Sequence, residues 1–218
     1  MMIALDRIFK FYKTYGVTKV VLDHVSMTFE FGNSYGVLGI NGAGKSTLMR
    51  LLAGTELPND GKITRSVRVS WPLGFAGGLH PKMTGRENVV FVARIYGHDT
   101  IKTLNFVEDF AEIGSYIDVP VQSYSSGMLQ RLAFGLSMAI DFDCYLIDEV
   151  TAVGDARFQA RCQQEFNKRR QYSDIVMISH DMNTLKQYCN RGVVLADGKL
   201  HLFRDLEDAI ALYRKLNR

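Results

Sequence analysis

Glycine, lysine and serine occur between positions 39 and 47 at a spacing that suits phosphate binding. The segment fits the pattern G-x-x-x-x-G-K-[ST] and lies between a short apolar strand pattern and a helical one. Glycines let backbone N–H groups surround an anion at a helix N-terminus, and the lysine and serine reach the phosphates and Mg²⁺. The pattern predicts a nucleoside triphosphate site formed by Gly39, Ile40, Asn41, Gly42, Ala43, Gly44, Lys45, Ser46 and Thr47.

A second candidate group lies where a later apolar segment ends in two carboxylates. Cys144-Tyr-Leu-Ile is followed directly by Asp148 and Glu149. In phosphate-loop proteins a neighbouring strand delivers an aspartate to Mg²⁺, and an adjacent glutamate can polarise the attacking water. We therefore predict Asp148 as a metal ligand, together with Ser46, and Glu149 as a catalytic residue. The alternative is a buried strand that ends in surface charge.

A serine turn precedes an amphipathic segment at residues 124–131. Ser125 or Ser126 is expected to cap this helix, which leaves backbone N–H groups as an anion site. A plain N-cap is the simpler alternative. A second phosphate-facing helix start, remote from the first, predicts that a nucleotide is held between two copies of the chain.

A histidine follows another apolar segment, Ile175–Ile178, in the sequence Ser179-His180-Asp181. Ligands bind at the carboxyl edge of parallel sheets. We therefore predict that His180 contacts the γ-phosphate, although a lone histidine at a strand end is commonly structural.

The elements that must position these residues alternate between strands and helices, which is typical of a parallel sheet covered on both faces. Thr84-Gly-Arg-Glu87 predicts a capping box at one helix start, and residues 71–81 are expected to form a structured loop. Strands are predicted at 3–9, 20–29, 35–39, 62–70, 144–147, 175–179 and 193–195, and helices within 84–140 and at 158–170 and 182–189.

Composition fits an ordinary globular protein, with 218 residues, 47% of them hydrophobic and 22% charged. The formal net charge of +3 is too small to argue for nucleic acid, which we do not expect as a partner. Three cysteines without metal-ligand spacing argue against a disulfide framework and favour a reducing compartment. No secretory signal pattern is present. Apolar runs are also shorter than the ~20 residues of a membrane helix.

In this order, the phosphate loop, the serine turn, the carboxylate pair and the histidine resemble the ATP-binding cassette (ABC) family of transporter ATPases. The resemblance implies an ATPase that binds ATP and Mg²⁺ and forms a head-to-tail dimer around two ATP molecules. Ser125 and Gly127 of one copy would complete the site at the other copy's phosphate loop. Tyr12, or less favourably Tyr15, would stack on adenine. Residues 152–155 resemble the loop that follows the catalytic glutamate and contacts the partner.

The same resemblance predicts the fold as α/β, with a phosphate-loop (RecA-like) core, an N-terminal antiparallel β layer and an inserted helical subdomain. The whole chain, 1–218, would be a single ABC ATPase domain. Its core would comprise residues 1–84 and 141–218, and its helical lobe residues 85–140.

Segments 70–75, 124–128, 131–134 and 142–150 are similar to the capsular polysaccharide exporters within this family. In that branch the ATPase is a peripheral subunit at the cytoplasmic face of the bacterial inner membrane. It drives a polytopic permease that exports a lipid-linked polysaccharide, with a periplasmic co-polymerase and an outer-membrane export protein beyond it. We expect no carbohydrate-binding extension after residue 218. The alternatives are export of another glycolipid polymer of the O-antigen or teichoic-acid type, a soluble ABC ATPase acting on nucleic acid or ribosomes, and a small-molecule phosphotransferase.

The chain departs from the family pattern in two places. The usual turn Leu-Ser-Gly-Gly-Gln has Ser126 in place of its first glycine and Met128 in place of its glutamine. No glutamine lies between Leu48 and Val121, so the glutamine that usually contacts Mg²⁺ is replaced near Phe75. We expect water to complete the metal's ligands, since Mg²⁺ readily keeps several.

Overall fold

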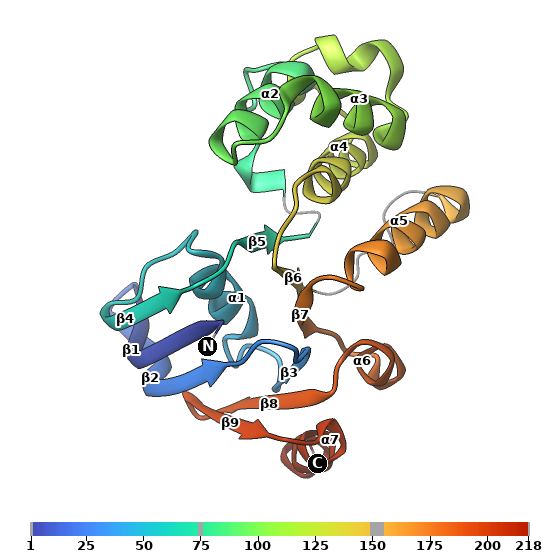
Figure 1. Cartoon of the computed structure of the whole chain (residues 1–218). Coiled ribbons are helices and arrows are strands. Elements are labelled where there is room, and N and C mark those ends of the chain that lie inside the picture. Colours follow the sequence, from blue (N-terminus) through green and yellow to red (C-terminus); the bar gives the residue numbers. More distant parts are fainter. Residues whose placement is uncertain (1, 74–75, 149–154, 218) are drawn as a thin grey trace. The chain divides into compact units, whose positions relative to one another are not determined.

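The computed structural model describes residues 2–73, 76–148 and 155–217, and its backbone divides into two units (Figure 1). Unit 1 contains Met1–Pro72, Phe142–Val150 and Ser173–Arg218. Unit 2 contains Leu73–Asp141 and Thr151–Tyr172. The predicted helical lobe at 85–140 lies within unit 2, which also takes in residues 73–84 and a later segment that carries helix α5 (Ala156–Arg169).

Unit 1 is built on a six-stranded sheet with the order β5-β6-β7-β3-β8-β9. Its neighbouring strands are parallel except for the pair β8–β9. The four central strands are almost fully buried, as expected when helices and strands cover both faces. The strands are β3 (Tyr35–Leu38), β5 (Val69–Pro72), β6 (Cys144–Asp148), β7 (Asp174–Ile178), β8 (Arg191–Ala196) and β9 (Lys199–Phe203). The predicted parallel sheet is confirmed, and β9 is an antiparallel edge strand that the sequence did not reveal.

Helices pack against this sheet and connect its strands. Helix α1 (Lys45–Ala53) contacts β5 and β6, while α6 (Met182–Tyr188) contacts β7. Helix α7 (Leu206–Leu216) contacts β3, β8 and β9. The alternation of strand and helix that the sequence shows therefore corresponds to strand–helix crossovers in the structure.

A second, antiparallel sheet in unit 1 has the order β2-β1-β4, formed by β1 (Ile3–Thr14), β2 (Val17–Phe29) and β4 (Asp60–Arg65). It confirms the predicted N-terminal β layer. The single strand predicted at 62–70 is wrong, because this segment forms β4 in one sheet and β5 in the other. After Arg65, the Ser66 N–H donates to the Met2 carbonyl and the chain then crosses between sheets. Alternation of residue types continues through the crossing, which is why the pattern looks unbroken.

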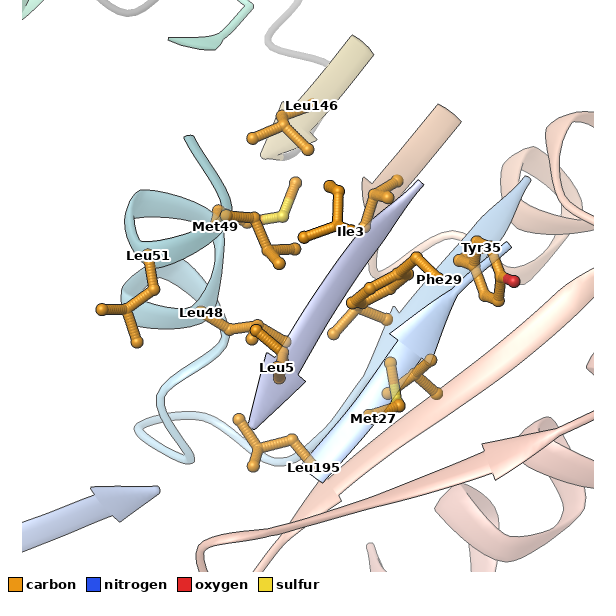
Figure 2. Close-up of a cluster of buried hydrophobic side chains, with 14 of the residues drawn as sticks. Ile3, Leu5, Met27, Phe29, Tyr35, Leu48, Met49, Leu51, Leu146 and Leu195 are labelled. Atoms are coloured by element: carbon orange, nitrogen blue, oxygen red, sulfur yellow. The ribbon is translucent and has the colours of Figure 1, made fainter. Parts of the chain in front are cut away.

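Both sheets and α1 share one hydrophobic core (Figure 2). Phe29 packs edge-on against Tyr35, with ring centroids 4.9 Å apart. Burial of this apolar surface holds α1, and with it the loop before α1, against the sheets. The labelled side chains in this cluster are Ile3, Leu5, Met27, Phe29, Tyr35, Leu48, Met49, Leu51, Leu146 and Leu195.

Unit 2 consists of helices α2 (Gly85–Ile95), α3 (Thr100–Ala111), α4 (Ser126–Ala139) and α5, with short 3₁₀ turns at Ala76–Gly78, Gly114–Asp118 and Val121–Ser123. The predicted capping box is confirmed: the Glu87 N–H donates to Thr84 Oγ1 at 3.1 Å, and the Thr84 N–H donates to Glu87 Oε2 at 2.8 Å. Phe158 of α5 packs edge-on against Phe110 of α3 at 5.5 Å. This contact explains why α5 belongs to unit 2. Among the helices in the described ranges, none has the length and apolarity needed to cross a membrane.

Candidate nucleotide-binding site

The predicted phosphate loop connects β3 to α1, and two of its glycines lie where no side chain fits. A Cβ atom on Gly39 would lie 2.7 Å from the Leu195 carbonyl oxygen. Gly44 has a φ of 110°, and a Cβ atom there would lie 2.1 Å from Val21 Cγ1. The loop is therefore pressed against β8 on one side and β2 on the other, and only glycine permits this approach.

Lys45, the first residue of α1, folds back over the loop. Its Nζ donates to the Gly39 carbonyl at 2.7 Å and to the Ile40 carbonyl at 3.2 Å. The Ile40 carbonyl also accepts from the Ala43 N–H at 3.1 Å, so a tight turn closes within the loop. Phosphate oxygens are stronger acceptors for an ammonium group than these carbonyls, because they carry charge. The geometry is that of a lysine ready to exchange carbonyl oxygens for phosphate oxygens.

Other loop residues divide into exposed and inward-facing groups. Ile40, Asn41 and Ser46 are exposed, whereas Thr47 is buried. The Thr47 hydroxyl accepts from Arg50 Nη2 at 3.2 Å. The Thr47 backbone N–H is among the first N–H groups of α1, which have no partner within the helix.

Asp148 and His180 lie at the same edge of the sheet as the loop. Strands β6, β7 and β3 are neighbours (Figure 1). Ile178 pairs with Asp148 on one side and with Val37 on the other. A strand spacing of about 4.8 Å places the Cα atoms of Asp148 and Val37 roughly 10 Å apart. Gly39 lies two residues after Val37, and His180 lies two residues after Ile178. Glu149, one residue beyond Asp148, lies outside the described residues.

The oxygen donors available at this edge suit Mg²⁺. Asp148 offers a carboxylate and Ser46 an exposed hydroxyl, and both are hard ligands. In the part of the chain that the structure describes, no group of three or more His, Cys, Asp and Glu residues could hold a metal ion. Asp148 and Ser46 would therefore fit as protein ligands of a Mg²⁺ ion that also keeps phosphate and water ligands. The position near Phe75 that lacks the family's glutamine lies outside the described residues.

Tyr12 is fixed in place by polar side chains that the sequence did not single out. Its hydroxyl donates to Glu56 Oε1 at 2.6 Å and accepts from Arg50 Nη2 at 3.1 Å. Lys10 Nζ lies 5.1 Å from the ring centroid. Tyr15, the less favoured candidate, is fully exposed at the tip of the β1–β2 hairpin. The structure thus holds Tyr12 in one orientation beside α1.

Glu56 is the centre of this polar cluster. Burial alone would raise the pKa of its carboxyl, but hydrogen bonds from Lys10, Tyr12 and Arg50 outweigh burial and lower the pKa to about 2. Lys10 is itself buried, and its Nζ lies 2.7 Å from Glu56 Oε1. Because all three donors point at one carboxylate, removal of its charge leaves a buried lysine without its counter-ion.

We predict that Glu56→Gln lowers the free energy of unfolding by about 2 to 3 kcal/mol at neutral pH. A carboxyl whose pKa is lowered on folding stabilises the protein above its unfolded pKa of 4.5, and this stabilisation is lost as the pH falls toward about 2. Urea denaturation at pH 7 and at about pH 3 should therefore show a difference from wild type that shrinks in acid. Glu207→Gln, which removes an exposed ion pair with Lys186, is the matched control and should change little. An equal difference at both pH values would contradict this account.

The serine turn lies in unit 2, at the start of α4. Ser125 is the N-cap, with its Oγ accepting from the Met128 N–H at 3.2 Å. Of the two serines predicted as possible caps, Ser125 is the cap, and Ser126 is the first residue of the helix. Both serines are exposed, and a Cβ atom on Gly127 would meet no atom within 4 Å. This end of α4 is open to an approaching group.

Asp155, the last residue of the loop predicted to contact the partner, is the N-cap of α5. Its carboxylate accepts from the Phe158 N–H at 2.9 Å and from Arg131 Nη2 at 3.1 Å. Arg131 belongs to α4 and stacks on the Phe158 ring, with its Cζ 4.3 Å from the ring centroid. The serine-turn helix is thereby tied to the start of α5. Residues 152–154 lie outside the described residues.

One cation at the phosphate loop was missed by sequence reasoning. Lys19 of β2 donates from Nζ to the Gly42 carbonyl at 2.9 Å. Lys19 is directly opposite Tyr12 in the β1–β2 pairing. A hairpin register could have suggested this neighbour of Tyr12, but nothing in the sequence showed that the lysine would reach the loop.

Comparison with known proteins identifies the family. Residues 22–152 match the ABC transporter family. The chain is 45% identical over 215 residues to the capsule polysaccharide export ATP-binding protein CtrD of Neisseria meningitidis, which covers 99% of this chain and all of the relative. It is 43% identical over 217 residues to the ATP-binding protein BexA of Haemophilus influenzae, with both chains fully covered.

A solved structure supports the fold. A dimeric ATP-binding cassette in a post-hydrolysis state, bound to ADP and Pi, has a TM-score of 0.73 and 21% identity, and the match covers 94% of this chain and 99% of that one. The predicted α/β cassette fold and the resemblance to transporter ATPases are confirmed. The chain belongs to the ABC transporter family and is one of its ATP-binding, ATP-hydrolysing subunits.

Proposed function

We propose that this chain is the ATP-hydrolysing subunit of an exporter of capsular polysaccharide, acting at the cytoplasmic face of the bacterial inner membrane. The observation that carries this proposal is the similarity, over the full length of both proteins, to ATP-binding proteins of capsule export. The identity to these proteins, 43% to 45%, is higher than the 35% to 37% identity to O-antigen and teichoic-acid export proteins, which favours capsule export over those alternatives.

The residues of unit 1 would bind and hydrolyse ATP by positioning and electrostatics rather than by covalent chemistry. In this proposal the loop N–H groups and Lys45 bind the phosphates, and Ser46 and Asp148 are ligands of Mg²⁺. Glu149 polarises the attacking water, and His180 contacts the γ-phosphate. The common sheet edge of the phosphate loop, Asp148 and His180 supports these roles. Tyr12 would stack on adenine.

A second copy of the chain would complete each site. Ser125 and Gly127 lie at an exposed helix start whose N–H groups suit an anion. We propose that they contact the γ-phosphate of ATP bound to the partner's phosphate loop, in a head-to-tail dimer. The dimeric state of the similar cassette bound to ADP and Pi supports this arrangement.

A polytopic permease would supply the path across the membrane. A periplasmic co-polymerase and an outer-membrane export protein would continue it, and nucleic acid would not be a partner. In this proposal ATP-driven closing of the dimer is the step that does work on the permease.

The proposal is tested by purifying the Glu149→Gln protein from its native host with Mg-ATP and identifying the bound proteins by mass spectrometry. We expect a polytopic permease to co-purify, because ATP-bound dimers accumulate in this variant. The matched control is Lys45→Ala, which should not accumulate such dimers. Recovery with ribosomes or nucleic acid instead of a permease would overturn the proposal in favour of a soluble ATPase.

A further inference from the structure

Strand β2 contacts the phosphate loop. The β1–β2 register shifts between the pairs Lys10–Leu22 and Phe11–Val20, so Val21 lies at a β-bulge, and both Val21 and Lys19 reach the loop. Val21 lies so close to Gly44 that a Cβ there would clash, and Lys19 Nζ lies 3.6 Å from the Cβ position of Gly42. Lys19 thus contacts the loop from a strand that is already packed against it.

The Lys19 amine donates to a carbonyl on the outside of the loop. In an anion-binding loop the N–H groups point inward, so carbonyl oxygens point outward and need other partners. The Gly42 carbonyl receives the 2.9 Å bond from Lys19. A bond from an ammonium group is charge-assisted and therefore stronger than one from a neutral donor.

Lys19 and Lys45 are linked through the loop by consecutive hydrogen bonds. Lys19 binds the carbonyl of the Gly42–Ala43 peptide, and the N–H of the same peptide donates to the Ile40 carbonyl. Lys45 binds that same Ile40 carbonyl. When Lys45 moves to phosphate, the Ile40 carbonyl loses one of its donors, whereas the bond from Lys19 to Gly42 need not change.

We propose that Lys19 is a positioning residue for nucleotide binding, which holds the Gly42 carbonyl and keeps the loop in shape while Lys45 transfers to the phosphates. The proposal rests on the nucleotide site proposed above. Lys19 acts before hydrolysis and through the loop, so it affects the affinity for nucleotide. It does not change the rate of the hydrolysis step, because bound phosphates themselves hold the loop.

The register of the β1–β2 hairpin also relates Lys19 to Tyr12. Lys19 pairs with Tyr12, so the strand position that holds the loop lies directly across from the aromatic ring beside α1. The phosphate loop, through Lys19, and the Tyr12 ring are therefore both attached to this one cross-strand pair. Loss of the Lys19 bond would leave Tyr12 held by Glu56 and Arg50 and would affect the phosphate side alone.

The test compares Lys19→Met with Lys13→Met, which removes the same charge from an exposed position of the same hairpin. Calorimetric titration with MgADP and steady-state hydrolysis of MgATP are the two measurements. We expect Lys19→Met to raise the Kd for MgADP and the KM for ATP about tenfold, with kcat within about twofold of wild type. Lys19→Arg should restore both constants to within about threefold, and Lys13→Met should resemble wild type.

Two results would overturn the inference. One is a Kd for Lys19→Met equal to that of Lys13→Met, and the other is a lower kcat with an unchanged KM. Lys45→Ala separates this failure from failure of the site itself. If Lys45→Ala also leaves the Kd for MgADP unchanged, the nucleotide site is wrongly placed; if it weakens binding and Lys19→Met does not, only the role of Lys19 is wrong.

Discussion

Replacing Lys45 by alanine is expected to lower the rate of ATP hydrolysis by about two to three orders of magnitude, because a preorganised cation at the phosphates is lost. In the structure the Lys45 ammonium is half-buried and lies on the Gly39 and Ile40 carbonyls at the mouth of the loop. Phosphate release in steady state is the measurement. The fold should remain intact, since the core beneath α1 is formed by apolar side chains.

Lys62→Ala is the matched control for this variant. Lys62 is an exposed lysine of the same unit, in the antiparallel strand β4. Its replacement should leave both hydrolysis and the melting temperature unchanged. If Lys45→Ala hydrolysed ATP at the wild-type rate, the phosphate loop would not be the site of hydrolysis.

Replacing Glu149 by glutamine is expected to stop turnover and to accumulate an ATP-bound dimer. Glutamine keeps the size of the side chain but cannot accept a proton from water, which removes a contribution of about 10²- to 10⁴-fold to the rate. ATP then stays bound, and with it the contact that Ser125 and Gly127 are proposed to make. Light scattering after size-exclusion chromatography should show twice the chain mass with Mg-ATP and a monomer with Mg-ADP.

Ser125→Arg in the Glu149→Gln background tests which surface closes the dimer. Ser125 is exposed at the start of α4, so the substitution adds bulk at the surface; it also removes the helix cap, at a cost of about 1 kcal/mol, while the buried side chains of α4 are unchanged. The dimer should disappear although each copy still binds ATP. Unchanged turnover in Glu149→Gln would refute the catalytic role, and an ATP-stable dimer that survives Ser125→Arg would refute the head-to-tail arrangement.

Features that depend on a few neighbouring residues were predictable from the sequence. The capping box of Thr84 and Glu87 and the strand before the phosphate loop are both confirmed. The capping box is set by backbone groups within four residues, which the Thr84 and Glu87 side chains satisfy locally. The strand was recognisable from its short apolar run, although its pairing partners β7 and β8 are distant in the sequence. The strand Cys144–Asp148 was expected from its apolar run and ends at the residue proposed as a metal ligand.

Strand pairings and side-chain contacts between segments far apart in the sequence were missed or wrongly predicted. The predicted strand at 62–70 spans a crossing between two sheets, and β9 is defined by its pairing with β8. Periodicity reports which side of a strand is buried, but it does not report which strand lies beside it. The Glu56 cluster and the Lys19 contact arise in the same way, because Tyr12 lies 44 residues from Glu56 and Lys19 lies 23 residues from Gly42.

The serine turn keeps its helix cap although two of its residues differ from the family pattern. Ser126 and Met128 depart from the family's usual turn, yet Ser125 still caps α4 and Gly127 still leaves its surface open. The cap depends on the Ser125 hydroxyl and the Met128 backbone N–H, so the identity of the Met128 side chain does not matter for it. The two departures therefore leave intact the local geometry that the proposed contact with ATP requires.

The most direct test of the account measures polysaccharide at the cell surface of the native host when its own copy carries Lys45→Ala. The account predicts that the polymer is still made but accumulates inside the cell, with none on the surface, while a Lys62→Ala strain is encapsulated normally. Normal surface polysaccharide in the Lys45→Ala strain, at an equal level of the protein, would contradict the claim that ATP hydrolysis by this chain powers export.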